Sequence, residues 1–286
     1  MSQDHGFKAA MVIGAGQMGS GIAQVLAITG VRTIIVDQSA PQLEQAEKSI
    51  KSSLSKMQAK AVITKEQGDA ATGLLSFEKD CSGAASVDLA IEAIVEKESA
   101  KVALFQQLDA LMPANSILAS NTSSIPITRL AAATKRPDKV IGMHFMNPVP
   151  IMKLVEIISG MATAAETRER IASLAKAMGK EISSSQDYPG FVVNRILMPM
   201  INEAFYALME GVASAEDIDR GMKLGTNQPM GPLTLADFIG LDTCYSILKV
   251  LHEGLGDSKY RPCPLLAKYV EAGFFGRKSK RGVYVY

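Results

Sequence analysis

The chain has 286 residues, of which 47% are hydrophobic and 21% are charged, a composition typical of globular proteins with one large domain or two ordinary ones. It carries 30 Lys and Arg residues against 29 Asp and Glu residues, so its overall charge gives no reason to expect nucleic acid or an anionic membrane as a partner. The three cysteines are far apart and show no C-x-x-C spacing, which indicates reduced thiols and no metal site.

The N-terminal residues predict a cytoplasmic protein. Residues 1–8 are polar, and they do not form the charged and then apolar pattern of a signal peptide. The apolar run that follows, residues 9–13, is too short to span a bilayer. We therefore expect a cytoplasmic location and no membrane partner.

The first forty residues have the pattern of a βαβ unit. Residues 8–14 form a short apolar run that ends in glycine, as buried parallel strands do. Residues 17–29 have helical periodicity, and residues 31–36 form a second, β-branched strand that is followed by Asp37. The order of strand, glycine turn, helix, strand and acid predicts a nucleotide-binding fold.

Strands and helices continue to alternate as far as residue 188. This alternation predicts an α/β fold with a doubly wound, mostly parallel Rossmann-type sheet. We expect helices at residues 41–61, 64–71, 97–111, 124–133 (with Pro126 in its first turn) and 163–178, and further strands at residues 74–77, 87–94, 116–119, 139–145, 154–158 and 180–184.

The pattern changes at the segment Asp187-Tyr188-Pro189-Gly190. Almost no strand signal follows it, and residues 191–209 are strongly apolar and helical. We therefore predict two domains, a nucleotide-binding domain at residues 1–188 and an all-helical domain at residues 189–286. Further helices of the second domain are expected near residues 215–224, 233–239, 242–253 and 264–272.

The glycine turn fits the pattern G-x-G-x-x-G of dinucleotide-binding proteins. Its glycines allow a tight turn, a close approach of the pyrophosphate to the backbone, and packing of the helix on the strand. Asp37 lies at the spacing expected for an acid that binds the ribose hydroxyls, and its charge would repel the 2′-phosphate of NADP. We expect NAD as cofactor, bound by Asp37 and by the turn residues Gly14, Ala15, Gly16, Gln17, Met18 and Gly19.

Two polar segments follow predicted strands and differ from ordinary packing sequence. The residues at 120–124 gather hydroxyl and amide groups, and His144 ends the strand at 139–145. Ligand sites of doubly wound sheets lie at the carboxyl ends of strands, so His144 is a candidate catalytic base. Glu156, in the next apolar run, is a candidate for the carboxylate that orients it. The alternative for Glu156 is a residue that faces solvent at the sheet edge.

Six segments, in order along the chain, together resemble the 3-hydroxyacyl-CoA dehydrogenase family, with the compact bacterial 3-hydroxybutyryl-CoA dehydrogenases as the nearest group. They are GAGQMGSGIAQ, IEAIVE, ASNTSSI, GMHFMNPVPIMKLVE, PGFVVNR and MGPLTLADFIGLD. The resemblance implies that His144 is the catalytic histidine, that Glu156 is its partner, and that Ser123 and Asn194 hold the reacting oxygen of the substrate. It also implies contacts with NAD at Glu96, Lys101, Ser123, Asn147 and Lys278.

The same resemblance places coenzyme A against Ser53 and Lys60, in addition to the substrate contact of Ser123. Lys56 and Lys60 lie one turn apart on the expected helix at 41–61, which suits the phosphates of coenzyme A. The alternative is that these lysines form a solvated helix face.

The expected activity is the NAD-dependent interconversion of a 3-hydroxyacyl-CoA and a 3-oxoacyl-CoA, with a preference for short chains such as 3-hydroxybutyryl-CoA and acetoacetyl-CoA. The family resemblance further implies a homodimer formed through the helical domain. Two alternatives remain. One is a β-hydroxyacid dehydrogenase, in which a lysine transfers the proton, and the other is a non-catalytic structural or sensor protein that binds NAD on the same fold.

Overall fold

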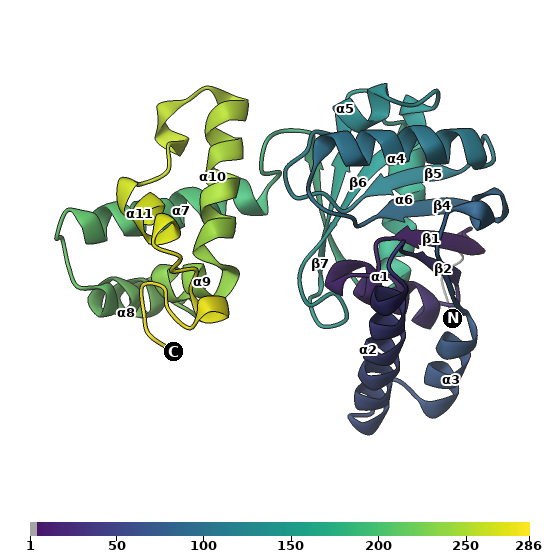
Figure 1. Cartoon of the computed structure of the whole chain (residues 1–286), viewed down its shortest axis with the longest axis horizontal. Coiled ribbons are helices and arrows are strands. Elements are labelled where there is room, and N and C mark those ends of the chain that lie inside the picture. Colours follow the sequence, from purple (N-terminus) through teal and green to yellow (C-terminus); the bar gives the residue numbers. More distant parts are fainter. Residues whose placement is uncertain (1–4) are drawn as a thin grey trace. The chain divides into compact units, whose positions relative to one another are not determined.

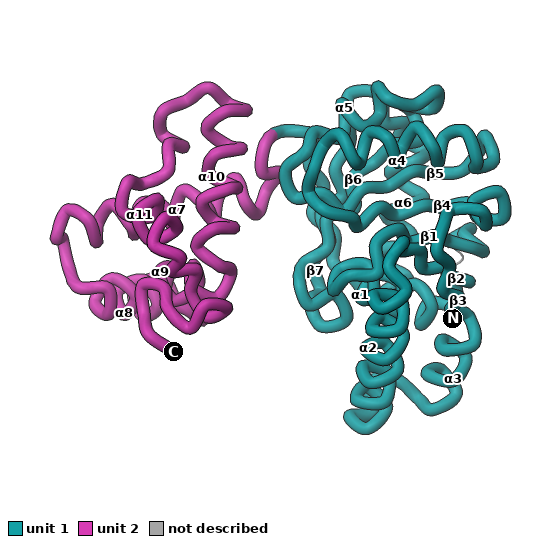
Figure 2. Tube along the Cα trace, viewed as in Figure 1, with its two compact units in different colours: residues 1–188 teal, residues 189–286 magenta. Residues whose placement is uncertain are grey.

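The structure, a computed structural model, describes residues 5–286. The chain divides into two compact units, Met1–Tyr188 and Pro189–Tyr286 (Figure 2). The first unit combines one large sheet with helices, and the second consists of helices and short connecting segments (Figure 1).

The sheet of the first unit has eight strands in the order β3-β2-β1-β4-β5-β6-β7-β8. All neighbouring strands are parallel except β6 and β7, which confirms the predicted Rossmann-type sheet. The chain reverses its direction of winding between β1 and β4, and such a switch point is where doubly wound sheets bind ligands. The strands are β1 (Ala9–Ile13), β2 (Arg32–Val36), β3 (Leu75–Glu78), β4 (Leu89–Glu92), β5 (Ile117–Ser120), β6 (Val140–Phe145), β7 (Leu154–Ser159) and β8 (Glu181–Gln186).

Helices cover both faces of this sheet. Alternate residues of the central strand, such as Ala10 and Val12, pack in one core cluster with Ile22 of α1, Leu43 of α2 and Leu174 of α6. In Figure 1, α4 and α5 lie on the opposite side of the strands from α1 and α2. The helices are α1 (Gln17–Ile28), α2 (Ala40–Ala59), α3 (Lys65–Gly73), α4 (Glu98–Leu111), α5 (Ile127–Ala132) and α6 (Ala165–Ala177).

One predicted helix begins later than expected. The sequence predicts a helix at 124–133 with Pro126 in its first turn, but α5 starts at Ile127, and Pro126 is the extended residue before it. A proline disfavours helical backbone at the residue before it, so a helix that begins at Ser124 is disfavoured at Ile125. The backbone N–H of Ser124 donates to the carboxylate of Glu96, 3.1 Å away, and residues 121–124 form a loop.

The second unit is a bundle of five α-helices, α7 (Val193–Met209), α8 (Ala215–Gly225), α9 (Pro232–Ile239), α10 (Leu241–Leu255) and α11 (Pro264–Glu271). Its core contains Phe205 of α7, Leu233 of α9, Leu248 of α10 and Leu266 of α11, all completely buried. Among residues 5–286, no helix has both the length and the apolar character needed to cross a bilayer. The cysteines Cys81, Cys244 and Cys263 are free and buried.

Candidate active site

Strands β6 and β7 bring His144 and Glu156 together. The antiparallel register sets these two residues directly opposite each other, so their side chains leave the sheet on the same face. His144 Nδ1 lies 2.8 Å from Glu156 Oε2. A carboxylate at this distance fixes the orientation of the imidazole and stabilises its protonated form. The alternative prediction, that Glu156 faces solvent at the sheet edge, is wrong. Strand β8 forms that edge, and Glu156 is 0% exposed.

The other imidazole nitrogen faces a serine. Ser123 lies in the loop between β5 and α5, and its Oγ is 2.9 Å from His144 Nε2. Carboxylate, imidazole and hydroxyl thus form one hydrogen-bonded chain at the carboxyl ends of β5 and β6. A hydroxyl group that comes within reach of Nε2 could transfer its proton to the imidazole while Glu156 stabilises the resulting cation.

Glu96 holds the loop that carries Ser123. Its Oε1 accepts hydrogen bonds from Thr122 Oγ1 at 2.5 Å and from the backbone N–H of Ser123 at 3.0 Å, and also binds the N–H and hydroxyl of Ser124. Burial raises the pKa of Glu96, but the Lys101 charge and the hydrogen bonds outweigh burial, so the net shift of the pKa is downward. Glu96 is therefore an ionised acceptor that fixes residues 122–124.

Lys101 lies beneath this loop and bridges two carboxylates. Its Nζ is 2.5 Å from Glu92 Oε1 and 3.0 Å from Glu96 Oε2, and its side chain is 1% exposed. Glu96 and Lys101 are predicted to contact NAD, whereas Glu92 is not among the residues predicted for the site. The sequence nevertheless contains a signal for Glu92. It is an acid that ends the apolar strand LAIE, and burial of such an acid is costly without a partner.

The glycine turn has the geometry that a dinucleotide pyrophosphate needs. Gly14 has a φ of +104°, and a Cβ there would lie 2.4 Å from the carbonyl oxygen of Ala93. A Cβ on Gly19 would meet the carbonyl oxygen of Gly14, whereas nothing lies within 4 Å of the position of a Cβ on Gly16. The backbone at Gly16 is thus open, at the start of α1, and an anion can approach it.

A cavity of about 780 Å³ extends from this turn past the end of β2. Asp37 lines it, and its carboxylate accepts the backbone N–H groups of Ala15 and Ser39, each at 2.9 Å. Apolar residues of the β4–α4 connection and of α4, including Ile94 and Leu104, line it too, together with polar residues such as Lys79 and Gln107. A fixed carboxylate beside a cavity with an apolar wall fits the ribose and adenine of NAD.

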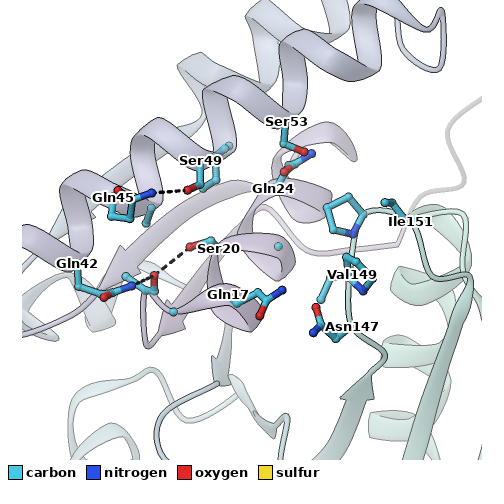
Figure 3. Close-up of a pocket in the computed structure, with 17 residues that line it drawn as sticks. Gln17, Ser20, Gln24, Gln42, Gln45, Ser49, Ser53, Asn147, Val149 and Ile151 are labelled. Atoms are coloured by element: carbon cyan, nitrogen blue, oxygen red, sulfur yellow. Dashed lines mark hydrogen bonds between the residues drawn. The ribbon is translucent and has the colours of Figure 1, made fainter. Parts of the chain in front are cut away.

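A second cavity, of about 360 Å³, lies on the other side of the turn (Figure 3). Helices α1 and α2 line one side of it, and the loop at 147–151 lines the other. Asn147 and Ser53 both line this cavity, and so does Gln17. Lys60 does not line this cavity, because it is an exposed residue that follows the last turn of α2. Met18, the remaining residue of the turn, packs against the core.

Two predicted site residues belong to the helical unit. Asn194 lies in the first turn of α7 and is 8% exposed. Lys278, in the short 3-10 helix Arg277–Ser279, forms an ion pair with Asp242 of α10 at 2.5 Å. Their contacts with the substrate and with NAD stay predictions. Residues 5–286 contain no group of three or more His, Cys, Asp or Glu residues that could hold a metal ion.

Two family models match almost the whole chain. Residues 9–187 match the NAD-binding domain of 3-hydroxyacyl-CoA dehydrogenase, and residues 190–286 match the C-terminal domain of the same family. The first match assigns NAD binding to the unit that contains the glycine turn and Asp37.

Relatives extend over the same length. The chain is 54% identical to the 3-hydroxybutyryl-CoA dehydrogenase of Bradyrhizobium diazoefficiens, over 96% of this chain and 94% of the relative. It is 44% identical to the mitochondrial hydroxyacyl-coenzyme A dehydrogenase of Homo sapiens, over 96% of this chain and 90% of the relative.

The crystal structure of (S)-3-hydroxybutyryl-CoA dehydrogenase from Ralstonia eutropha superposes with a TM-score of 0.95 at 46% identity, over 98% of this chain and 99% of that one. A 3-hydroxyisobutyrate dehydrogenase from Salmonella typhimurium, by contrast, is 15% identical with a TM-score of 0.60 and shares the fold alone. The chain belongs to the 3-hydroxyacyl-CoA dehydrogenase family.

Proposed function

We propose that the protein catalyses the reversible, NAD-dependent oxidation of a short-chain 3-hydroxyacyl-CoA to the 3-oxoacyl-CoA. The observation that carries this proposal is the hydrogen-bonded chain of Ser123, His144 and Glu156 in an NAD-binding domain. It supplies a proton acceptor and a hydroxyl donor at one point, as oxidation of a secondary alcohol requires.

His144 is the base of the reaction. Its Nε2 removes the proton of the 3-hydroxyl group, and Glu156 stabilises the imidazolium that forms. Ser123 donates a hydrogen bond to the same oxygen, and Asn194 is a second ligand of that oxygen by family resemblance. NAD, when bound, supplies the acceptor for the hydride that leaves C3. In the reverse direction, protonated His144 returns its proton to the oxygen of the ketone.

The cofactor is held by the first unit. The glycine turn at 14–19 binds the pyrophosphate, and Asp37 binds the ribose hydroxyls beside the larger cavity. Glu96, Lys101, Asn147 and Lys278 are further NAD contacts by family resemblance. Because a carboxylate at Asp37 repels a 2′-phosphate, NADH should be a much better cofactor than NADPH.

The substrate assignment rests on the relatives, which include the 3-hydroxybutyryl-CoA dehydrogenase at 54% identity and another at 46%. Short acyl groups are therefore the proposed preference. Ser53 lines the cavity between α2 and the loop at 147–151, a suitable position for part of coenzyme A. Lys60, exposed at the end of α2, is the proposed partner of a coenzyme A phosphate.

A cytoplasmic homodimer is the proposed state of the protein. The helical unit has large apolar side chains on its surface, including Ile196 (68% exposed), Val212 (71%) and Leu224 (75%). The homodimer itself is proposed from the family resemblance, with these side chains as candidates for the contact between copies. Sedimentation equilibrium tests this proposal, and a monomer at all concentrations would contradict it.

Oxidation of NADH by acetoacetyl-CoA, followed by absorbance, tests the function. We expect rapid turnover with NADH and slow turnover with NADPH. Faster turnover with NADPH would overturn the assignment of Asp37 but not the reaction. Failure with acetoacetyl-CoA and longer 3-oxoacyl-CoA substrates, in folded protein that binds NADH, would favour a non-catalytic NAD-binding protein.

A further inference from the structure

Glu92, at the carboxyl end of β4, is a completely buried acid that the proposed reaction does not use. Its Oε1 is 2.7 Å from the backbone N–H of Ile94 and 2.5 Å from Lys101 Nζ. Its Oε2 accepts the hydroxyl of Ser120 at 2.6 Å. Burial of a carboxylate is unfavourable without such partners, so these contacts hold Glu92 in one position.

Two routes lead from Glu92 to the loop that carries Ser123. In the first, Ser120 Oγ, held by Glu92, accepts the backbone N–H of Thr122 at 3.1 Å. In the second, Lys101 joins Glu92 to Glu96, whose Oε1 accepts the N–H of Ser123 at 3.0 Å. Both routes end within one residue of the hydroxyl that faces His144.

The contacts of Glu92 are directed to the site rather than to the body of the sheet. Its side chain bonds to Ile94 in the β4–α4 connection, to Lys101 in the first turn of α4, and to Ser120 at the end of β5. Asp109 and Arg136 provide a contrast. This ion pair, also of low exposure, ties the end of α4 to the segment before β6, away from Ser123.

We propose that Glu92 is a positioning residue, which sets the place of the Ser123 hydroxyl through Ser120 and through the Lys101–Glu96 pair. This role presupposes the proposed dehydrogenase activity, in which Ser123 holds the reacting oxygen. A small displacement of a group that orients the substrate reduces turnover much more than it reduces cofactor binding.

The test compares Glu92→Gln with Glu98→Gln. Glutamine keeps the size of the side chain but removes the charge that holds Lys101. Glu98 is a matched control, because it lies in the first turn of α4 and pairs only at the surface with Arg129. Ser120→Ala interrupts the first route alone, and it carries the test if Glu92→Gln does not fold. Ser123→Ala removes the hydroxyl itself, so its kcat and its His144 NMR signal serve as the reference for a lost hydroxyl.

Two readouts separate positioning from a merely structural role. The first is kcat with acetoacetyl-CoA, together with the dissociation constant for NADH. The second is the NMR signal of the His144 ring in the free protein, which can be resolved because the chain has only three histidines. We expect Glu92→Gln to lower kcat about tenfold to hundredfold and to weaken NADH binding by a smaller factor, because the proposed NAD contacts Glu96 and Lys101 also depend on Glu92.

The His144 signal should shift in Glu92→Gln in the same direction as in Ser123→Ala, and more weakly in Ser120→Ala. Glu98→Gln should leave the signal and kcat unchanged. A Glu92→Gln variant that loses thermal stability but keeps the parent's His144 signal and kcat would overturn the proposal. So would a loss confined to NADH affinity. The NMR comparison needs no substrate, so it remains decisive even if the parent protein lacks the proposed activity.

Discussion

Both units bury carboxylates, but these acids have different partners. In the first unit, Glu156 is paired with an imidazole, and the imidazole also contacts a serine hydroxyl. In the helical unit, Asp219 accepts the backbone N–H groups of Leu233 and Thr234 and the hydroxyl of Tyr284. Burial of an acid therefore does not mark a catalytic site. What distinguishes Glu156 is that its imidazole partner also contacts a hydroxyl group at the carboxyl ends of the strands.

Asp237 repeats the structural pattern of Asp219. Its two oxygens accept the backbone N–H groups of Val283 and Tyr284, each at 2.9 Å. A Cβ on Gly276 would lie 2.2 Å from the Asp237 carbonyl oxygen, so the C-terminal segment packs tightly here. Both aspartates hold the end of the chain on the bundle. Replacement of Glu156 in the first unit should thus reduce activity, whereas replacement of Asp219 or Asp237 in the helical unit should reduce stability.

The largest effect on activity is expected at His144. His144→Gln removes the group that accepts the proton, so kcat should fall about a thousandfold to ten-thousandfold. NADH affinity, measured by fluorescence titration, should stay close to that of the parent. An equal loss of NADH affinity would mean that His144 supports the fold of the cofactor site instead.

Glu156→Gln should have the next largest effect, a loss of about a hundredfold to a thousandfold in kcat, because the amide cannot stabilise the imidazolium. The KM for acetoacetyl-CoA should change much less. A variant with normal kcat and a raised KM would indicate that Glu156 shapes the substrate site and does not act on His144.

Asp219→Asn should reduce stability and leave kcat per folded molecule unchanged. The amide turns one acceptor into a donor that faces buried donors, which costs about 1–3 kcal/mol. Thermal unfolding followed by circular dichroism measures the loss. Unchanged stability together with reduced kcat would reverse the comparison between the two units.

The smallest effect is expected for Glu96→Gln, a small loss of thermal stability that disappears at acid pH. Its pKa lies below the ordinary value of 4.5, so ionisation of Glu96 stabilises the fold above that pH, and the contribution disappears as pH falls through the lowered pKa. The side chain is 40% exposed, so Glu96→Gln should lower Tm by only about 1–3 °C near neutral pH. Scans of both proteins should converge below pH 4.5. A Tm difference between the two proteins that grows at acid pH would contradict the downward shift of the Glu96 pKa.

Much of the first unit could be predicted, because its signals are local in sequence. The glycine turn, the acid after β2 and the alternation of strands and helices specify a Rossmann-type sheet without any tertiary information. His144 and Glu156 stand out for the same reason, since each is a polar residue within an apolar strand. The register of the antiparallel pair β6 and β7, which sets them opposite each other, has no comparable signal in the sequence.

The loop at 121–124 illustrates the limit of prediction. Pro126 indicates a helix start and disfavours helical backbone at the residue before it, but the contact of Ser124 with the distant Glu96 has no signal in the sequence. The link from Glu92 through Lys101 likewise joins residues whose roles depend on how β4 and α4 pack. Periodicity predicts elements, whereas these contacts depend on tertiary geometry.

The central claim is that Glu156 acts through His144, and a double-mutant cycle on kcat tests it most directly. The cycle compares the parent with His144→Gln, Glu156→Gln and the double variant. If Glu156 serves only to orient and stabilise the imidazole, its replacement should cost almost nothing once His144 is absent, and the double variant should match His144→Gln. Losses that multiply would show two independent contributions and contradict the account.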